Sequence, residues 1–352
     1  MKANSPGFGN ATPRIHGGPD QYGVPLHDFS TNSNACGPCP DALDAVREAD
    51  AQTYPDPGYR QLRAQLASFH AVAPERIVLA ASGSEFIFRM TAAIAGMHGR
   101  SAASVYLPAH GFGDYAQAAA AHGLATSGNA PTAQLRWVCE PSSPVGGLDS
   151  GLAGLAASGF CTVLDRAYEP LRLQGQMALT RAQLGKVWQL WTPNKALGLT
   201  GIRAAYAVVP AADDAQALVQ ELERLCPSWP VGVHGVALLM QWTRPQVQQW
   251  LAETVVTLAA WKRRQIELCI ALGWEVLPGV ANFFCARPAL PPGLTLADAL
   301  MKLRQQGIKL RDCASFGLPG MVRLSVQSPQ AQDALHNAWQ SMVLTESGGK
   351  TS

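Results

Sequence analysis

Residues 192–203, TPNKALGLTGIR, set one lysine, Lys195, among hydroxyl groups, glycines and an arginine. The stretch follows the apolar run 187–191, which has the composition of a buried strand. Lys195 is therefore expected where a strand ends and a loop begins, a position at which many proteins place functional groups. An amine there can attack the carbonyl group of a cofactor, whereas most lysines are solvated surface residues.

Apolar runs like the one before Lys195 recur along the chain, separated by helical or loop segments. They cover residues 77–80, 104–107, 135–138, 160–164 and 204–209. This alternation predicts an α/β fold, a three-layer α/β/α arrangement around a mainly parallel sheet. Ligands of such sheets bind at the carboxyl ends of the strands, where Asp165, Lys195 and the turn 82–84 are expected.

The turn Ser82-Gly83-Ser84 follows the strand 77–80 and opens a helical pattern that runs to about His98. Backbone N–H groups at a helix N-terminus, with small residues and hydroxyl groups around them, suit a phosphate. Such junctions are common, so the turn supports a phosphate site only together with Asp165 and Lys195.

The remaining pattern divides the chain into four parts. Residues 1–40 form an N-terminal arm, 41–235 a large domain with helices at 41–49 and 59–71, 236–344 a smaller C-terminal α+β lobe, and 345–352 a tail. One long helix over 233–272 is expected to join the large domain to the lobe.

The composition indicates a compact globular protein. The 352 residues are 47% apolar and 15% charged, with a net charge of +2. Lysines and arginines are dispersed, which argues against a nucleic-acid partner, and no apolar stretch is long enough to span a membrane. We expect a cytoplasmic protein with no metal site.

Two of the eight cysteines lie in the segment Cys36-Gly-Pro-Cys39, which matches the Cys-x-x-Cys pattern of thioredoxin-type redox centres. Such a centre normally follows a βαβ unit, whereas here an irregular segment precedes it. A zinc site would need a second pair of ligands. Redox chemistry remains a minor alternative.

The segment Asp165-Arg166-Ala167-Tyr168, followed by Thr192 to Lys195 and then Arg203, resembles the core signature of fold type I pyridoxal-phosphate enzymes of the class I/II aminotransferase superfamily. The resemblance extends from about residue 16 to 340. It implies pyridoxal 5'-phosphate as cofactor and a homodimer with a shared active site.

The resemblance also implies a role for each site residue. Lys195 would form a Schiff base with the cofactor and move protons, Asp165 would pair with the pyridine nitrogen, and Tyr168 would donate to the ring oxygen. The other implied cofactor contacts are Gly83, Ser84, Thr192 and Arg203 at the phosphate, Phe112 (or His110) against the ring, Ser143 at the ring oxygen, and Tyr54 from the other subunit.

Two arginines are implied to bind the substrate. Arg323 matches the family arginine that grips a carboxylate, and Arg311 lies in a segment that resembles histidinol-phosphate aminotransferases and threonine-phosphate decarboxylases, where it contacts a phosphate. The sequence Arg311-Asp312-Cys313 resembles the decarboxylases of cobalamin biosynthesis more than the aminotransferases. The same holds for the N-terminal segments around His16 and Asn34. His16 and Asn34 are therefore also expected to bind substrate.

Three positions depart from the family pattern: Ser143 replaces a usual asparagine, Ser82 a glycine and Ala35 a proline. With these departures noted, the sequence favours a lyase that decarboxylates L-threonine O-3-phosphate. The alternatives are a histidinol-phosphate-type aminotransferase and a homologue that binds pyridoxal phosphate without catalysis.

Overall fold

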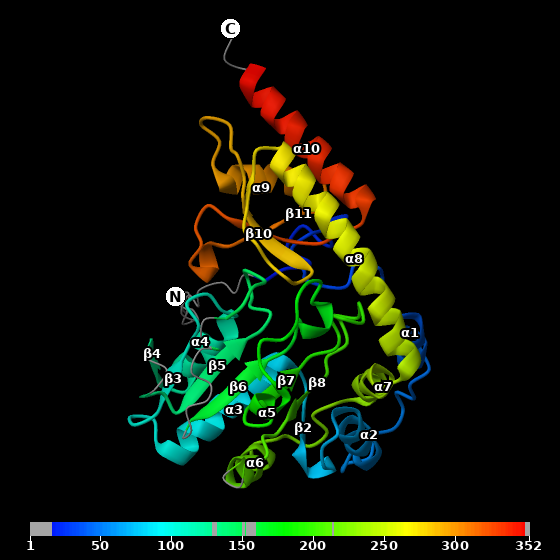
Figure 1. Ribbon diagram of the computed structural model, residues 1–352, viewed down its shortest axis with the longest axis vertical. Coiled ribbons are helices and arrows are strands. Elements are labelled where there is room, and N and C mark those ends of the chain that lie inside the picture. The colour runs from blue at the N-terminus through cyan, green and yellow to red at the C-terminus, as the bar shows by residue number, and fades with distance from the viewer. Residues whose placement is uncertain (1–15, 129–131, 150–151, 153–159, 213–214, 349–352) are drawn as a thin grey trace, which may run out of the picture.

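The computed structural model describes residues 16–128, 132–149, 152, 160–212 and 215–348. The chain forms a seven-stranded sheet with helices on both faces, and a smaller C-terminal lobe lies at one end of it (Figure 1). The strands of the large sheet are β2 (Ile77–Ala80), β3 (Ser104–Tyr106), β4 (Ala125–Ser127), β5 (Leu135–Cys139), β6 (Cys161–Asp165), β7 (Trp188–Trp191) and β8 (Ala205–Val208).

The strand order is β2-β8-β7-β6-β5-β3-β4. All pairings from β7 to β4 are parallel, whereas β8 runs antiparallel to both of its neighbours, β7 and β2. Because β2 and β7 flank the reversed strand, they point the same way. The carboxyl ends of β2, β6 and β7 therefore meet at one edge, and the predicted mainly parallel three-layer sheet is confirmed.

Helices cover both faces of this sheet, which explains why its central strands are continuous apolar runs. One face packs against α3 (Gly83–His98), α4 (Gly113–Ala121) and α6 (Ala215–Arg224). The other packs against α1 (Pro40–Arg47), α2 (Arg60–His70) and α7 (Val233–Trp242). The four-residue helix α5 (Arg181–Leu184) lies just before β7.

The prediction of one helix over 233–272 is wrong. The structure has α7, a break at Thr243 and Arg244, and then α8 (Pro245–Ala271). Pro245 cannot donate the hydrogen bond that would continue α7, but it is well suited to the first turn of a new helix. Leu258 of α8 packs in the core of the large sheet and Cys269 in the core of the lobe, so this helix connects the two.

The C-terminal lobe has the predicted α+β composition. Its antiparallel sheet has the order β12-β13-β10-β9, with β9 (Glu275–Val276), β10 (Phe283–Arg287), β12 (Arg311–Asp312) and β13 (Val322–Ser325). Its helices, besides the end of α8, are α9 (Leu296–Gln305) and α10 (Pro329–Gly348). The predicted tail starts inside α10, because residues 345–348 continue that helix; residues 349–352 lie outside the described residues.

The N-terminal segment packs against the lobe. Strand β1 (His27–Asp28) pairs in parallel with β11 (Ile308–Lys309), and Asp20 forms ion pairs with Arg304 and Lys309 at 2.8 and 3.0 Å. The predicted arm therefore joins sequence-distant parts of the fold from residue 16 onward, and residues 1–15 are outside the described range. Among the described helices, none is long and apolar enough to cross a membrane.

Candidate active site

A cavity of about 700 Å³ opens at the edge where β2, β6 and β7 end. A smaller one of about 260 Å³ adjoins it and shares His16, Phe112, Ser143, Tyr168 and Lys195 as lining residues. The two cavities together form one site. The larger part extends toward the start of α3 and the smaller part toward the C-terminal lobe.

Lys195 lies half-buried in the turn after β7, and its Nζ is 5.5 Å from the centre of the Tyr168 ring. Its carbonyl oxygen accepts hydrogen bonds from the backbone N–H groups of Asn34, at 2.9 Å, and Gly198, at 3.2 Å. The Asn194 amide donates to the carbonyl oxygens of Thr200 and Ile202 and closes the turn. The backbone around Lys195 is therefore fixed, and its side chain extends into the cavity.

Asp165 is the last residue of β6 and is buried. Its Oδ2 accepts from the Tyr115 hydroxyl at 2.7 Å and its Oδ1 from the Ala167 N–H at 2.9 Å. Burial raises the pKa of Asp165, and the two hydrogen bonds and the charge of Lys195 oppose that rise. A cation placed against this carboxylate would favour its ionised form further, so Asp165 suits a protonated ring nitrogen.

The start of α3 lines one end of the larger cavity. A Cβ on Gly83 would lie 2.8 Å from Thr192 Cγ2, so only glycine lets the helix start approach this closely. Ser82 Oγ caps α3 by accepting from the Glu85 N–H at 3.0 Å, which gives a structural reason for serine in place of the usual glycine.

Two polar side chains at this end of the cavity are free to bind a ligand. The buried Thr192 Oγ1 has no hydrogen-bond partner, and the exposed Arg203 makes no hydrogen bond or ion pair within the described part of the chain. Ser84 lines the same end. A helix N-terminus, free hydroxyl groups and an arginine fit the phosphate of pyridoxal phosphate, and Lys195 and Asp165 fit its aldehyde and ring nitrogen.

Of the two aromatic residues predicted to stack on the cofactor ring, one lines the cavities and the other does not. Phe112, at the start of α4, lines both cavities, whereas its alternative His110 lines neither and instead places Nδ1 2.8 Å from the Phe316 carbonyl oxygen. Tyr168 packs edge-on against Phe283, with 4.7 Å between ring centres. Geometry favours Phe112 as the aromatic residue beside a ring.

Arg311 and Arg323 are buried and line the smaller cavity. Arg311 donates to Ser315 Oγ at 2.8 Å and Arg323 to the Ser30 carbonyl oxygen at 2.8 Å. Both guanidinium groups lie over the Phe316 ring, 4.7 and 5.6 Å from its centre. Burial, and secondly the charge of Arg323, lower the pKa of Arg311, so an anion between the arginines would relieve unfavourable electrostatics.

Ser143, the replacement for asparagine, is buried and lines both cavities. Its Oγ accepts a hydrogen bond of 3.3 Å from Arg323 Nη1. The hydroxyl therefore contacts the substrate-side arginine as well as the space beside Lys195, a connection that the sequence did not indicate.

Asn34 does not have the position expected of a substrate-binding residue. It lines neither cavity, and its amide Nδ2 donates to the Ala196 carbonyl oxygen at 3.0 Å and Thr254 Oγ1 at 2.9 Å. Its side chain instead ties the N-terminal segment to the Lys195 turn and to α8. His16, by contrast, lines both cavities, with its ring centre 6.4 Å from that of Phe112.

Tyr54 also lies outside both cavities. Its side chain is 76% exposed and stacks on Trp229, with ring centres 4.4 Å apart. Within one subunit the residue therefore lies away from the site, and its role toward a second subunit stays a prediction.

The thiols of Cys36 and Cys39 are free, and burial raises the pKa of both, that of Cys36 to about 11. A redox-active thiol needs the opposite shift, because the thiolate is the reactive form. This observation argues against the redox alternative.

Several lining residues were not predicted from the sequence. They include Thr31, Asn32, Glu85, Tyr115, Gln117, Asn194, Thr200, Ser315 and Phe316. The clearest missed signal is Tyr115, which follows Phe112 by one helical turn and so faces the same cavity.

Comparison with known proteins gives an independent result. The family model for aminotransferase class I and II matches residues 150–338. A histidinol-phosphate aminotransferase of Jannaschia sp. (strain CCS1) is 27% identical over 327 residues, covering 86% of this chain and 87% of that protein. Histidinol-phosphate aminotransferase 2 of Burkholderia mallei is 28% identical over 340 residues, covering 87% and 89%.

Solved structures share the fold. Histidinol-phosphate aminotransferase from Sinorhizobium meliloti, in complex with pyridoxal-5'-phosphate, superposes with a TM-score of 0.78 at 21% identity, covering 97% of this chain and 99% of that one. L-threonine-O-3-phosphate decarboxylase from Porphyromonas gingivalis gives a TM-score of 0.73 at 21% identity, with 90% and 99% coverage. At these identities the likeness concerns the fold alone.

Proposed function

Because the chain belongs to the aminotransferase class I and II family and is a pyridoxal-phosphate-dependent enzyme, we propose that its substrate is an amine that carries a phosphate group. The supporting observation is the pair of buried arginines, Arg311 and Arg323, in the cavity that Lys195 also lines. Two guanidinium groups held over one phenylalanine ring can each bind one anion with paired hydrogen bonds.

Transamination of the histidinol-phosphate type is the reaction that the relatives favour. They support this alternative better than the decarboxylation of L-threonine O-3-phosphate that the sequence favoured. Both substrates carry the phosphate on the carbon next to the amine-bearing carbon, so one position of Arg311 serves either. Arg323 would then bind the carboxylate of the amino-group acceptor in transamination.

Decarboxylation remains a second candidate because of the residues around Arg311. The sequence Arg311-Asp312-Cys313 resembles that of the decarboxylases. Phosphothreonine also carries both a phosphate and a carboxylate, so that Arg311 and Arg323 could each bind one of its anionic groups. Which bond breaks depends on which substituent the arginines hold perpendicular to the cofactor ring.

Each side chain has a distinct task in this proposal. Pyridoxal phosphate supplies a ring that withdraws electrons from the amine-bearing carbon. Lys195 Nζ holds the cofactor and then moves a proton at that carbon, while Asp165, supported by Tyr115, keeps the ring nitrogen charged. The remaining cofactor contacts are Gly83, Ser84, Thr192 and Arg203 at the phosphate, Phe112 on the ring face, and Tyr168 and Ser143 near the ring oxygen.

The cofactor roles are tested by spectroscopy and the reaction by its products. Purified, cofactor-supplied wild type should show a visible absorbance band that is missing in Lys195→Ala; a wild type without this band would disprove the role of Lys195. Histidinol phosphate should be consumed only with an oxoacid acceptor such as 2-oxoglutarate. Carbon dioxide release from phosphothreonine without any oxoacid would instead establish decarboxylation.

The role of Arg311 is tested separately. Arg311→Ala should lose about 100-fold in kcat/KM for the phosphorylated substrate, since a paired arginine–phosphate contact contributes roughly 3 kcal/mol. The same enzyme should lose much less on the unphosphorylated amine. The exposed Arg287, on the same lobe, gives the control Arg287→Ala. Equal losses on both substrates would remove Arg311 from the phosphate site.

A further inference from the structure

A cavity of about 250 Å³, separate from the active site, lies beside the end of α2, helix α5 and strand β7. It shares no lining residue with the two cavities described above. Three arginines line it, Arg76, Arg166 and Arg181, and none of the described residues that line it is acidic. The proposed reaction does not use this concentration of positive charge.

Arg166 is the most enclosed of the three, with a side chain that is 11% exposed. It donates to Gln189 Oε1 at 2.8 Å and lies over the Trp191 ring at 4.2 Å. Its ion pair with Glu169 is long, 3.7 Å, and its buried Nε has no hydrogen-bond partner. The charge of Arg166 is therefore only weakly neutralised within the protein.

The other two arginines keep donor groups free. Arg76 donates through Nε and Nη2 to the Val209 carbonyl oxygen, at 2.8 and 2.6 Å, which fixes the side chain while Nη1 makes no bond within the described residues. Arg181 is exposed, and its guanidinium group makes no hydrogen bond or ion pair in that part of the chain. Both can turn N–H groups toward a ligand.

His70 completes the polar lining without adding charge. Its Nε2 is 2.8 Å from the Tyr206 hydroxyl, and burial, with Arg166 as the second cause, lowers the pKa of His70 to about 4. The ring is therefore neutral near pH 7. The positive charge of the cavity comes from its arginines alone.

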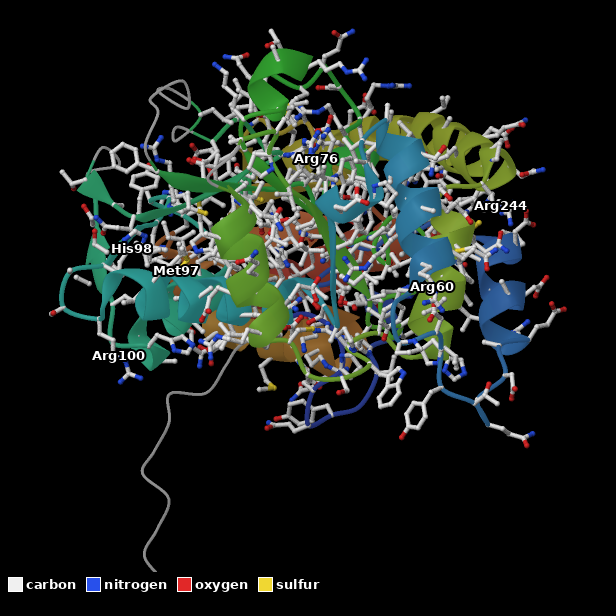
Figure 2. All side chains as sticks on the ribbon, turned by 90° about the horizontal axis from the view of Figure 1, so that it is seen from below. Arg60, Arg76, Met97, His98, Arg100 and Arg244 are labelled. Atoms are coloured by element: carbon white, nitrogen blue, oxygen red, sulfur yellow. The ribbon has the colours of Figure 1, made fainter. Side chains whose placement is uncertain are left out.

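The position of Arg166 separates this cavity from the active site. Asp165 is the last residue of β6, and Arg166 follows it with its N–H bonded to the Leu190 carbonyl oxygen of β7 at 2.8 Å. Consecutive side chains of such an extended segment point to opposite faces. Asp165 accordingly lines the cofactor cavity and Arg166 this one. Figure 2 shows Arg76 on the end of the molecule that faces away from the C-terminal lobe.

We propose that this cavity is a binding site for a phosphate-type oxyanion, either inorganic phosphate or the phosphate group of a small metabolite. Arginine forks match the oxygens of a phosphate, and a doubly charged anion neutralises more of the triple positive charge than a carboxylate does. The inference does not depend on the proposed reaction, because it concerns other residues and is tested by binding.

The test is calorimetric titration of the pyridoxal-phosphate-loaded enzyme with inorganic phosphate, glycerol phosphate and acetate. The cofactor then fills its own phosphate site, and all proteins carry Arg311→Ala together with Arg323→Ala to remove both arginines of the substrate cavity. We expect one saturable site for phosphate. The Kd for phosphate should rise at least about tenfold in Arg166→Met and in Arg181→Gln, because each variant loses one charged hydrogen bond to the anion.

Arg100→Gln is the matched control, since Arg100 is exposed on the same lower face but away from the cavity (Figure 2). Its Kd should be unchanged. Arg181 is exposed, so Arg181→Gln remains informative if Arg166→Met does not fold. Absence of saturable binding, equal affinity in all variants, or tighter binding of acetate would overturn the proposal. Tighter binding of glycerol phosphate would identify a phosphorylated metabolite, and tighter binding of phosphate the free ion.

Discussion

At the scale of single residues, the site depends on a carboxylate that burial makes difficult to ionise. Burial raises the pKa of Asp165, and the Tyr115 hydroxyl at 2.7 Å offsets part of that effect. Tyr115 is itself fully buried, and burial followed by the charge of Asp165 raises its pKa well above the ordinary value. The hydroxyl therefore stays protonated and acts as a permanent donor to Asp165.

We accordingly predict that Tyr115→Phe reduces kcat about tenfold and weakens cofactor binding to a similar extent, since a hydrogen bond to a charged group contributes about 1.5 kcal/mol or more. Cofactor titration and steady-state kinetics measure the two effects. Tyr106→Phe, on strand β3 and outside both cavities, should leave cofactor binding and kcat unchanged. Unaltered kinetics in Tyr115→Phe would show that Asp165 does not need this donor.

The same residues show what the sequence could and could not predict about the site. Asp165 and Lys195 were predictable because each follows an apolar run, and the ends of such strands meet at one edge. Tyr115 approaches Asp165 from a helix 50 residues earlier in the chain, a contact that no local pattern reports. The sequence did not predict the position of Asn34, because a polar residue in an irregular segment has the same sequence pattern whether it contacts a ligand or forms hydrogen bonds between backbone segments.

At the scale of secondary-structure elements, six of the seven strands of the large sheet were predicted to within a residue or two, since strands covered on both faces are continuous apolar runs. The edge strand β4 was missed because its residues are polar or exposed. Strand direction was not predicted, because the hydrophobic periodicity is the same for parallel and antiparallel strands. The reversed direction of β8 was therefore not recognised. The break before Pro245 was missed because the apolar pattern of α7 continues into α8.

The turn that carries Lys195 depends on one glycine. Gly198 has φ +70, and a Cβ there would lie 2.5 Å from the Gly37 carbonyl oxygen and 3.0 Å from Pro38 Cα. We predict that Gly198→Ala lowers the free energy of unfolding by about 2 kcal/mol or more, from left-handed strain plus the steric clash. The displaced turn should also weaken cofactor binding.

Gly201 provides the control in the same turn. A Cβ at Gly201 would meet no atom within 4 Å, so Gly201→Ala should change stability by less than about 0.5 kcal/mol. Denaturant unfolding of both variants measures the difference. Equal stability of the two would mean that the N-terminal segment does not pack closely against the Lys195 turn in solution.

Helix α8 is held to the lobe through a buried lysine. Lys262, 3% exposed, donates to the carbonyl oxygens of Gly279 and Ala281 at 2.5 and 2.8 Å, and burial lowers its pKa from 10.5 to about 8. Between these pH values the unfolded chain binds a proton that the folded protein does not. Unfolding then takes up a proton, so stability increases as the pH rises through this window.

We therefore predict that the free energy of unfolding of the wild type, measured relative to Lys262→Met, rises by about 1.5 kcal/mol between pH 8 and 9.5. Below about pH 7 the lysine is protonated in both states and the difference should be constant. Denaturant titrations of both proteins across the pH range provide the measurement. A difference that stayed flat or fell above pH 8 would contradict the buried, proton-deficient state of Lys262.

At the scale of the whole molecule, an exposed aromatic pair outside the two active-site cavities supports assembly. Tyr54 and Trp229 are 76% and 41% exposed yet stack with 4.4 Å between ring centres, and Trp229 Nε1 donates to the Pro55 carbonyl oxygen at 3.2 Å. Ordered aromatic residues on a surface are typical of interfaces. We propose that the enzyme is a homodimer in which Tyr54 of each subunit completes the cofactor site of the other.

This proposal predicts complementation between two defective variants. Lys195→Ala should be inactive, and Tyr54→Ala should lose at least about tenfold in activity if its hydroxyl contacts the cofactor phosphate. In a hybrid dimer one site combines the intact Lys195 of one subunit with the intact Tyr54 of the other. Random mixing makes half of the dimers hybrids, each with one intact site of two, so about a quarter of wild-type activity should return.

A mixture of Lys195→Ala and Asp165→Ala provides the contrast, because both residues line the cavity of a single subunit and no hybrid site then contains both intact. Activity should return only in the first mixture, after co-expression or after unfolding and refolding together. If neither mixture gains activity while hybrids are present, Tyr54 acts within its own subunit or not at all. The exposure of Tyr54, outside every cavity that Lys195 lines, makes complementation the outcome we expect.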